Sequence, residues 1–131
     1  MQGQCLCGAI QVSTETQTDA GLCHCRMCRR WTSGPLHAVH CSGPVTFSGD
    51  TPRRYRSSEW AERGFCATCG THLFYYLRPN DEYILSAGLF PETSFTLRQE
   101  VFIEEKPDYY AAQEHTEKMT GAEVYAKYGH Y

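Results

Sequence analysis

The sequence predicts a mainly β domain, and three of its segments carry this prediction. Apolar and polar residues alternate over residues 9–14, with the period of two that is typical of a strand buried on one face. Residues 71–77 hold a threonine and three aromatic residues, types that are enriched in strands. Alternation over residues 95–103 would turn Thr96, Arg98 and Glu100 outward and would bury Phe95, Leu97, Val101 and Ile103.

Shorter segments complete the expected fold. Further strands are predicted at residues 36–41, 45–47 and 83–87, and Gly-Pro pairs, which mark turns, precede the first two of them. A short helical turn is expected between residues 23 and 31. Residues 53–56 include three arginines, which either face water at a strand edge or form an anion-binding patch.

The chain of 131 residues is expected to form one domain that buries roughly two-thirds of its unfolded surface. The core covers about residues 1–106 and a C-terminal tail covers residues 107–131. Within the tail, residues 108–112 and 123–128 suggest one or two short helices, split by Gly121. The tail either packs over a functional site as a lid or is held loosely.

Charge and hydropathy exclude several classes of protein. The net charge is −3 and the sequence pI is about 6.0, which argues against a nucleic-acid coat or a membrane-surface protein. No apolar run approaches the roughly 20 residues that span a bilayer, so no membrane partner is expected. The first residues lack the basic and then apolar pattern of a secretory signal, and we therefore expect a cytoplasmic location.

Eight cysteines indicate where the chemistry lies. Cys23, Cys25 and Cys28 lie within six residues, so they can converge on one metal ion if the backbone curls around it. The thiolate is the metal-binding form of cysteine, and zinc favours a tetrahedral set of sulfur or nitrogen atoms. Three protein ligands leave one position free for water or substrate, which is the arrangement of a catalytic zinc site.

Four other cysteines can share a second ion. Cys5 and Cys7 form one pair, Cys66 and Cys69 form the other, and each pair is followed directly by glycine. Glycine accepts the positive φ of a turn that points backbone N–H groups at bound sulfur. Together the two pairs supply four thiolates, which complete a closed, structural site.

Other uses of the cysteines compete with zinc. Four disulfides would suit a secreted protein, but a chain without a secretory signal belongs in the reducing cytosol, where disulfides are rare. Iron–sulfur clusters also use clustered thiolates, although paired turns that end in glycine fit zinc better. Cys41 is left over and is either a buried core thiol or a fourth ligand at the three-cysteine site.

The order of these motifs resembles a known family. The patterns CxCG from Cys5, CHCxxC from Cys23 and GFCxxCG up to Gly70 are similar to those of the glutathione-dependent formaldehyde-activating enzymes, whose relatives include centromere protein V. The resemblance is close over residues 5–70 and looser to about residue 90. It implies a zinc-stapled, mainly β fold with two zinc ions per chain: a structural zinc at Cys5, Cys7, Cys66 and Cys69, and a catalytic zinc at Cys23, Cys25 and Cys28.

The resemblance also implies a carbon–sulfur lyase activity. A thiol such as glutathione would bind at the open site and add to an aldehyde, giving S-hydroxymethylglutathione when the aldehyde is formaldehyde. Arg29 and Arg30 could hold the carboxylates of glutathione, because the guanidinium fork matches a carboxylate, or they could only balance the charge of the thiolates. His24 is expected to point away from the metal and to hydrogen-bond a sulfur.

A non-enzymatic function remains as the alternative. A β domain with two zinc ions could instead bind a protein or a nucleic acid, although the net charge of −3 disfavours nucleic acid. The two interpretations differ in whether the open site accepts a small-molecule thiol and an aldehyde.

Overall fold

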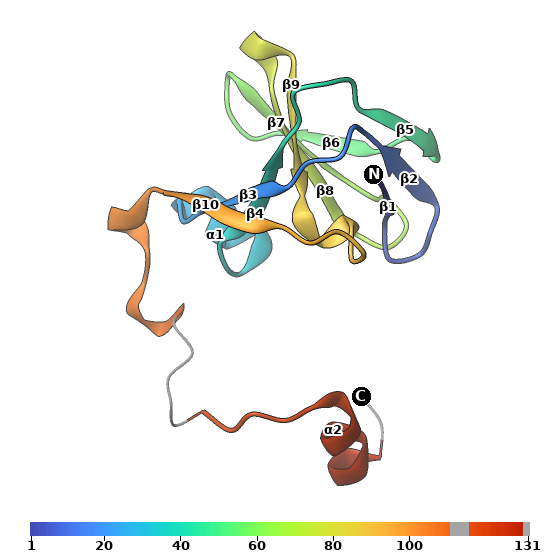
Figure 1. The fold of residues 1–131 in the computed structure, drawn as a ribbon. Coiled ribbons are helices and arrows are strands. Elements are labelled where there is room, and N and C mark those ends of the chain that lie inside the picture. The colour runs from blue at the N-terminus through green and yellow to red at the C-terminus, as the bar shows by residue number, and fades with distance from the viewer. Residues whose placement is uncertain (111–115, 130–131) are drawn as a thin grey trace.

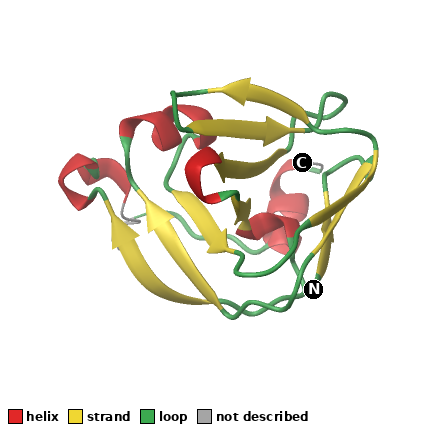
Figure 2. Ribbon diagram, turned by 90° about the horizontal axis from the view of Figure 1, so that it is seen from above, coloured by secondary structure: helices red, strands yellow, loops and turns green. Residues whose placement is uncertain are grey.

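The computed structural model describes residues 1–110 and 116–129, and it confirms the mainly β class (Figure 1). The strands form one sheet of seven and one of three. Seen from above, they curve around the centre of the domain instead of lying in one flat layer (Figure 2), as the right-handed twist of strands favours. Within the described ranges, no helix combines the length and the apolar character that crossing a membrane requires.

The larger sheet carries most of the domain. Its strands, in spatial order, are β10 (Thr96–Val101), β3 (Asp19–Cys23), β4 (Leu36–His40), β9 (Glu82–Ser86), β8 (His72–Leu77), β7 (Ala61–Phe65) and β6 (Arg53–Arg56). Neighbouring strands run antiparallel except for β10 and β3, which are parallel. Because β3, β4, β9, β8 and β7 lie inside the sheet, side chains that are distant in sequence meet across their faces.

The smaller sheet consists of β1 (Gln2–Gln4), β2 (Ile10–Ser13) and β5 (Thr46–Gly49), with β2 in the middle. Ile10 and Val12 are buried whereas Gln11 and Ser13 are exposed, so the alternation predicted for this segment is confirmed. The two buried side chains belong to the same core cluster as Phe74 of the larger sheet. The two sheets therefore share one hydrophobic core.

Phe74 is fully buried at the centre of this core. Its ring packs against the backbone of Gly64 on the neighbouring strand β7, at the position that a Cβ atom of residue 64 would occupy. Glycine is required there because any side chain would overlap the ring. A tight contact of this kind holds β7 and β8 in a fixed register.

Two α-helices lie in the described residues. Helix α1 (Arg26–Thr32) follows β3 and ends at Ser33, which adopts a left-handed conformation. Helix α2 (Gly121–Tyr128) begins after Thr120, whose hydroxyl accepts from the backbone N of Glu123. Gly121 therefore opens a helix, and the prediction that it divides two helices is wrong. Short 3-10 turns lie at Arg78–Asn80, Ala87–Leu89, Ile103–Glu105 and Asp108–Tyr110; residues 111–112 of the predicted tail helix lie outside the described ranges.

Strand β10 is shorter than predicted, and the prediction of a buried face is wrong. All six of its residues are exposed. Its register against β3 shifts between Leu97 and Gln99, so that Leu97 pairs with Ala20 and Val101 with Cys23. Partners three residues apart on β3 put Leu97 and Val101 on opposite faces. The regular alternation fails because an irregularity interrupts an edge strand that nothing covers among the described residues.

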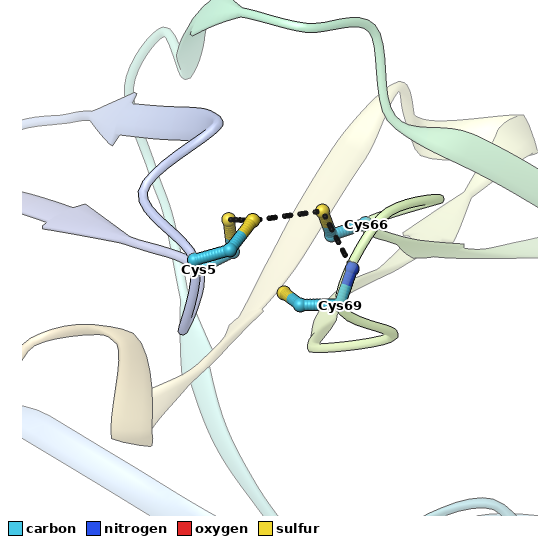
Figure 3. Close-up of side chains that lie close together, drawn as sticks. Cys5, Cys66 and Cys69 are labelled. Carbon is cyan, nitrogen blue, oxygen red and sulfur yellow. Dashed lines mark hydrogen bonds between the residues drawn. The ribbon is translucent and has the colours of Figure 1, made fainter.

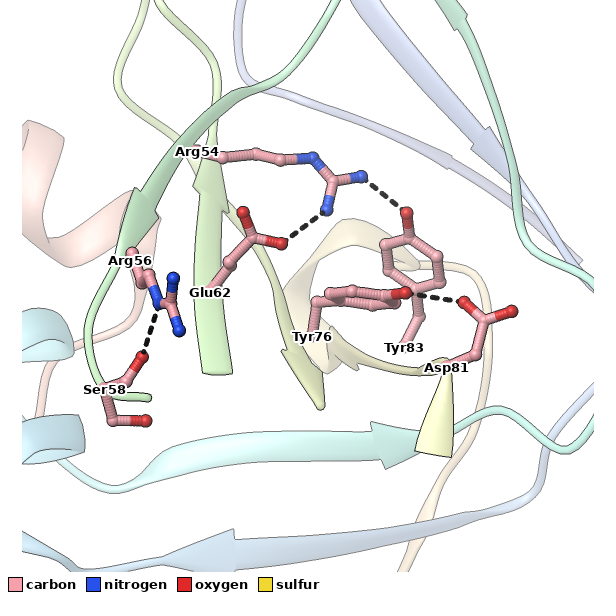
Figure 4. A network of polar contacts seen from close by, with 7 residues as sticks. All are labelled: Arg54, Arg56, Ser58, Glu62, Tyr76, Asp81 and Tyr83. Carbon is pink, nitrogen blue, oxygen red and sulfur yellow. Dashed lines mark hydrogen bonds and ion pairs between the residues drawn. The ribbon is translucent and has the colours of Figure 1, made fainter. Parts of the chain in front are cut away.

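Two of the three arginines of β6, Arg54 and Arg56, find partners within the domain (Figure 4). Arg54 donates to the hydroxyl of Tyr83 (2.5 Å) and pairs with Glu62 (3.5 Å), and its guanidinium lies over the ring of Phe74. Arg56 Nε donates to the carbonyl oxygen of Ser58 (3.2 Å). These contacts favour the interpretation of residues 53–56 as a strand edge over that of an anion-binding patch.

Candidate metal centres and the cavity beside them

The four-cysteine cluster joins the two sheets. Cys5 and Cys7 lie in the turn between β1 and β2, and Cys66 and Cys69 lie in the turn between β7 and β8 (Figure 3). Their four Sγ atoms lie within 4.8 Å of one another, with 3.6 Å between Cys5 and Cys7 and 3.8 Å between Cys7 and Cys66. Four sulfurs held about 2.3 Å from a zinc ion stand about 3.8 Å apart. The cluster therefore has the dimensions of a tetrahedral metal site.

Backbone groups support the sulfur atoms of this cluster. Ile10 N donates to Cys5 Sγ (3.4 Å), and Cys69 N donates to Cys66 Sγ (3.5 Å). The glycines that follow the pairs, Gly8 and Gly70, have positive φ angles of 79° and 77°, as predicted. N–H groups that point at sulfur favour the thiolate, the form that binds a metal.

The hydroxyl of Thr71 links the two turns. It accepts from Leu6 N (3.0 Å) and lies 3.1 Å from Cys69 Sγ. Donation from this hydroxyl is the largest of the effects that lower the pKa of the Cys69 thiol, to about 5. Cys69 thus favours the thiolate, whereas burial and the neighbouring thiols raise the pKa of Cys7, and a metal cation would offset the charge that the four sulfurs share.

The three-cysteine cluster is built locally. Cys23 is the last residue of β3, Cys25 caps the N-terminus of α1, and Cys28 lies in the first turn of that helix. Their Sγ atoms also lie within 4.8 Å of one another, and Cys28 N donates to Cys25 Sγ (3.3 Å). Cys41 lies outside both groups; it is buried in the core, where its thiol faces the carbonyl oxygen of Val39. The described chain thus offers one set of four sulfurs and one set of three.

A buried arginine accompanies the three-cysteine cluster. Arg63, on β7, is 4% exposed, and its Nη1 donates to Cys28 Sγ at 3.5 Å. Its guanidinium lies over the rings of Trp31 and Tyr75, 5.1 Å from each centroid. A hydrogen bond from Cys23 and then the contact with Arg63 lower the pKa of the Cys28 thiol to about 5. Three thiolates with one divalent cation carry a charge of −1, which Arg63 offsets.

The three-cysteine cluster opens into a cavity of about 490 Å³. Leu36, Ala38 and Ile84 form its buried wall, and they belong to one apolar cluster with Cys28. Cavities of a few hundred cubic ångströms with mainly apolar walls and a few polar groups are typical of small-molecule sites. The four-cysteine cluster does not line this cavity. The two clusters therefore differ in the way that a closed and an open metal site would differ.

The sequence pattern of the family described as "Glutathione-dependent formaldehyde-activating enzyme" matches residues 1–105 and thus includes both clusters. The chain belongs to this family. A protein of Schizosaccharomyces pombe named an uncharacterized lyase is 35% identical over 127 residues, which cover 94% of this chain and 93% of that protein. A lyase-like role is therefore supported at the level of the family.

The fold of the formaldehyde-activating family also occurs in a solved structure. A crystal structure of a Rhodobacter sphaeroides protein superimposes with a TM-score of 0.56, covering 73% of this chain and all of that one. The two sequences are 24% identical, so the likeness concerns the fold alone.

The arginines that line the cavity in this family member are not the two singled out from the sequence. Arg26 and Arg63 are lining residues, whereas Arg29 and Arg30 are not. Arg29 Nε donates to the carbonyl oxygen of His24 (3.1 Å), and Arg30 is exposed. The role of Arg29 and Arg30 in binding carboxylates stays a prediction. Arg63 was missed because only the pairing of β7 with β8 brings it to the cysteines.

The side chain of His24 is directed at β10 in this member of the formaldehyde-activating family. The residue is 1% exposed, and its Nε2 contacts Glu100 Oε1 at 2.9 Å. Its Nδ1 has no partner among the described residues, and its ring lies 5.5 Å from that of Tyr110. The predicted hydrogen bond from His24 to a sulfur is therefore not found. Its contacts instead connect β10 and residue 110 to the segment of residues 23–28, which holds the three cysteines.

Proposed function

We propose that the protein is a zinc-dependent carbon–sulfur lyase, which forms or cleaves the adduct of a thiol and an aldehyde. One observation carries this proposal: three convergent cysteine sulfurs and a buried arginine lie side by side at one cavity. The family supplies the class of substrate, with S-hydroxymethylglutathione as the reference adduct. Membership in the family supports the lyase class, and the geometry of the cavity supports its location at the three-cysteine cluster.

The cysteines fit zinc in both places. Cys5, Cys7, Cys66 and Cys69 would hold a structural ion, and Cys23, Cys25 and Cys28 would hold a second ion with one position left for a ligand. The second zinc would supply one kind of chemistry, the stabilisation of a bound thiol as its thiolate. All eight cysteines are free thiols, so the ligands are not withdrawn into disulfides.

Arg63 would act on the oxygen of the aldehyde. When the deprotonated thiol donates its electron pair to the carbonyl carbon, the carbon–sulfur bond forms and the π pair moves to oxygen. A guanidinium N–H directed at that oxygen stabilises the developing negative charge, and the oxygen then takes a proton from water. The reverse sequence cleaves the carbon–sulfur bond. Contacts with the rings of Trp31 and Tyr75 hold the guanidinium in place.

The apolar walls have a separate part in this proposal. Leu36, Ala38 and Ile84 exclude water from the sulfur atoms, and lower local polarity strengthens the interaction between Arg63 and a developing oxyanion. Arg29 and Arg30 are proposed as anchors only for those parts of a glutathione adduct that extend beyond the cavity.

The proposal is tested by measuring the exchange between ¹³C-formaldehyde and its thiol adduct by NMR, with the zinc-loaded protein. Exchange should accelerate with the wild-type protein and return to the uncatalysed rate with Cys25→Ser. The enzymatic proposal would be overturned if the protein is folded and binds two zinc ions but does not accelerate the exchange for any thiol and aldehyde tested. That result would favour the alternative, a non-catalytic two-zinc β domain.

A further inference from the structure

We infer that the cavity at the three-cysteine cluster selects a thiol with an apolar body, aromatic or branched, over a charged peptide thiol such as glutathione. This inference rests on the proposed function, since it assumes that a thiol binds at Cys23, Cys25 and Cys28. The selectivity concerns the part of the thiol beyond its sulfur, and it follows from the residues that line the cavity.

Apolar side chains surround the cysteines at two levels. Close to Cys28, the wall consists of Leu36, Ala38 and Ile84, each less than 9% exposed. At the mouth, Trp60 and Phe102 are 54% and 50% exposed, and both line the cavity. Large apolar side chains that remain half exposed beside a cavity gain by being covered, and an apolar ligand would cover them.

Except for Arg26, whose side chain is exposed at the mouth, the charged groups of the cavity already have partners or oppose a carboxylate. Arg63 donates to Cys28, and the proposed reaction uses its remaining N–H groups at the aldehyde oxygen, so Arg63 is not free to bind a carboxylate of the ligand. His40 pairs with Glu82 at 2.9 Å. At the mouth, Glu105 Oε2 accepts from the backbone N of Arg26 at 2.8 Å, and its charge would repel an incoming carboxylate. A ligand with two carboxylates would lose hydration here, and Arg26, whose backbone N contacts Glu105, could compensate only one of them.

Size alone does not decide between the ligands, because about 490 Å³ is large enough for either. The chemistry of the walls decides. In an apolar thiol such as 2-phenylethanethiol, burial of the phenylethyl group favours binding in proportion to its apolar area. A carboxylate of glutathione placed beside Glu105 is disfavoured. We expect the apolar thiol to bind at least about tenfold more tightly than glutathione.

The test uses cobalt-loaded protein, in which thiolate ligation gives an intense charge-transfer band. The protein is titrated separately with 2-phenylethanethiol, 2-mercaptoethanol and glutathione. The inference expects the band to shift at the lowest concentration with 2-phenylethanethiol. Equal or tighter binding of glutathione would overturn the inference and leave the proposed function standing. No shift with any of the three thiols would overturn both.

Two matched variants test whether the selectivity for apolar thiols arises at the mouth of the cavity. Trp60→Ser removes an apolar side chain at the mouth, and Tyr55→Ser removes one that is 64% exposed on β6 and does not line the cavity. Trp60→Ser should weaken 2-phenylethanethiol about three- to tenfold and leave 2-mercaptoethanol unchanged, while Tyr55→Ser should change neither. Equal losses for both thiols in Trp60→Ser would show that the residue only supports the fold and would overturn its role in selection.

Discussion

Arg63 Nη1 lies 3.5 Å from Cys28 Sγ, although 35 residues separate them in sequence. The contact places a permanent positive charge against a sulfur that is itself buried. Neither group would be stable there alone, because an unpaired charge in an apolar cluster has lost its hydration without compensation. This pair therefore connects strand β7 to helix α1.

Replacement of Arg63 tests this connection. A hydrogen bond to a charged partner contributes about 1.5–3 kcal/mol, so Arg63→Gln should weaken metal binding at the three-cysteine cluster about ten- to a hundredfold. Competition with a chromophoric chelator measures the loss. Arg63→Lys, which keeps the positive charge, should recover part of the lost metal affinity. Arg56→Gln, at an arginine that contacts only backbone oxygens of the loop after β6, serves as the control. Unchanged metal affinity in Arg63→Gln would contradict the prediction.

The two clusters should respond differently when a ligand is lost. A structural zinc contributes about 10–16 kcal/mol to a small domain, whereas the net stability of a domain is only about 5–15 kcal/mol. Cys69→Ser should therefore unfold the protein. Cys25→Ser should remain folded and bind one zinc instead of two, because its cluster joins residues that are close in sequence. Circular dichroism measures whether each variant is folded, and elemental analysis measures its zinc content. Equal unfolding of both variants would refute the division into a structural and an open site.

Gly64→Ala should destabilise the protein strongly. The added Cβ would occupy the position of the Phe74 ring, which is fully buried and has no space to move into. Overpacking of this kind costs about 1–3 kcal/mol, and a rigid neighbour places the cost at the upper end. Urea denaturation measures the free energy of unfolding. Gly88→Ala, where an added Cβ meets nothing within 4 Å, should change it far less. Similar losses in the two variants would show that the contact with Phe74 is unimportant.

The stability of the protein should fall in mild acid, in part through His72. Burial, and then the nearby charge of Arg63, lowers the pKa of His72 below its usual value of 6.5. His72 therefore binds a proton more readily in the unfolded chain than in the folded protein. Its contribution to the free energy of unfolding is fully present above pH 6.5 and is lost as the pH falls below that value. His72→Phe, which keeps an aromatic ring against Trp31, should flatten the dependence of the unfolding free energy between pH 7.5 and 5.5. Identical slopes would contradict this assignment.

The grouping of the cysteines within each motif could be predicted from the sequence because the geometry of each motif is local. Two cysteines that flank one or two residues must lie on the same turn, and a glycine that follows lets the turn close. The positive φ angles of Gly8 and Gly70 confirm the predicted turns. Which pairs share an ion depends on the fold, and there the resemblance to the family supplied the answer.

Arg63 could not be found in the same way. It lies in the segment Ala61–Phe65, where a glutamate and an arginine hide the pattern of an interior strand. Its place beside Cys28 follows from the register of β7 against β8, which pairs Arg63 with Tyr75. Strand β3 was missed for a similar reason, because polar and small residues at Asp19–Cys23 show no alternation even though the strand lies inside the sheet. Long-range pairing overrides local pattern in both cases.

The hydroxyl of Thr71, which contacts both Leu6 and Cys69, has a consequence for the order of folding. The four-cysteine cluster cannot assemble until segments 59 residues apart meet, as the contact of Cys7 with Cys66 requires. Closure of so long a loop has a large entropic cost, whereas Cys23, Cys25 and Cys28 can gather around an ion as soon as one turn of helix forms. During synthesis from the N-terminus, Cys5 and Cys7 leave the ribosome well before their partners exist. We therefore expect the ion at the open cluster to be captured first, and the ion that fastens the two sheets together to be captured last.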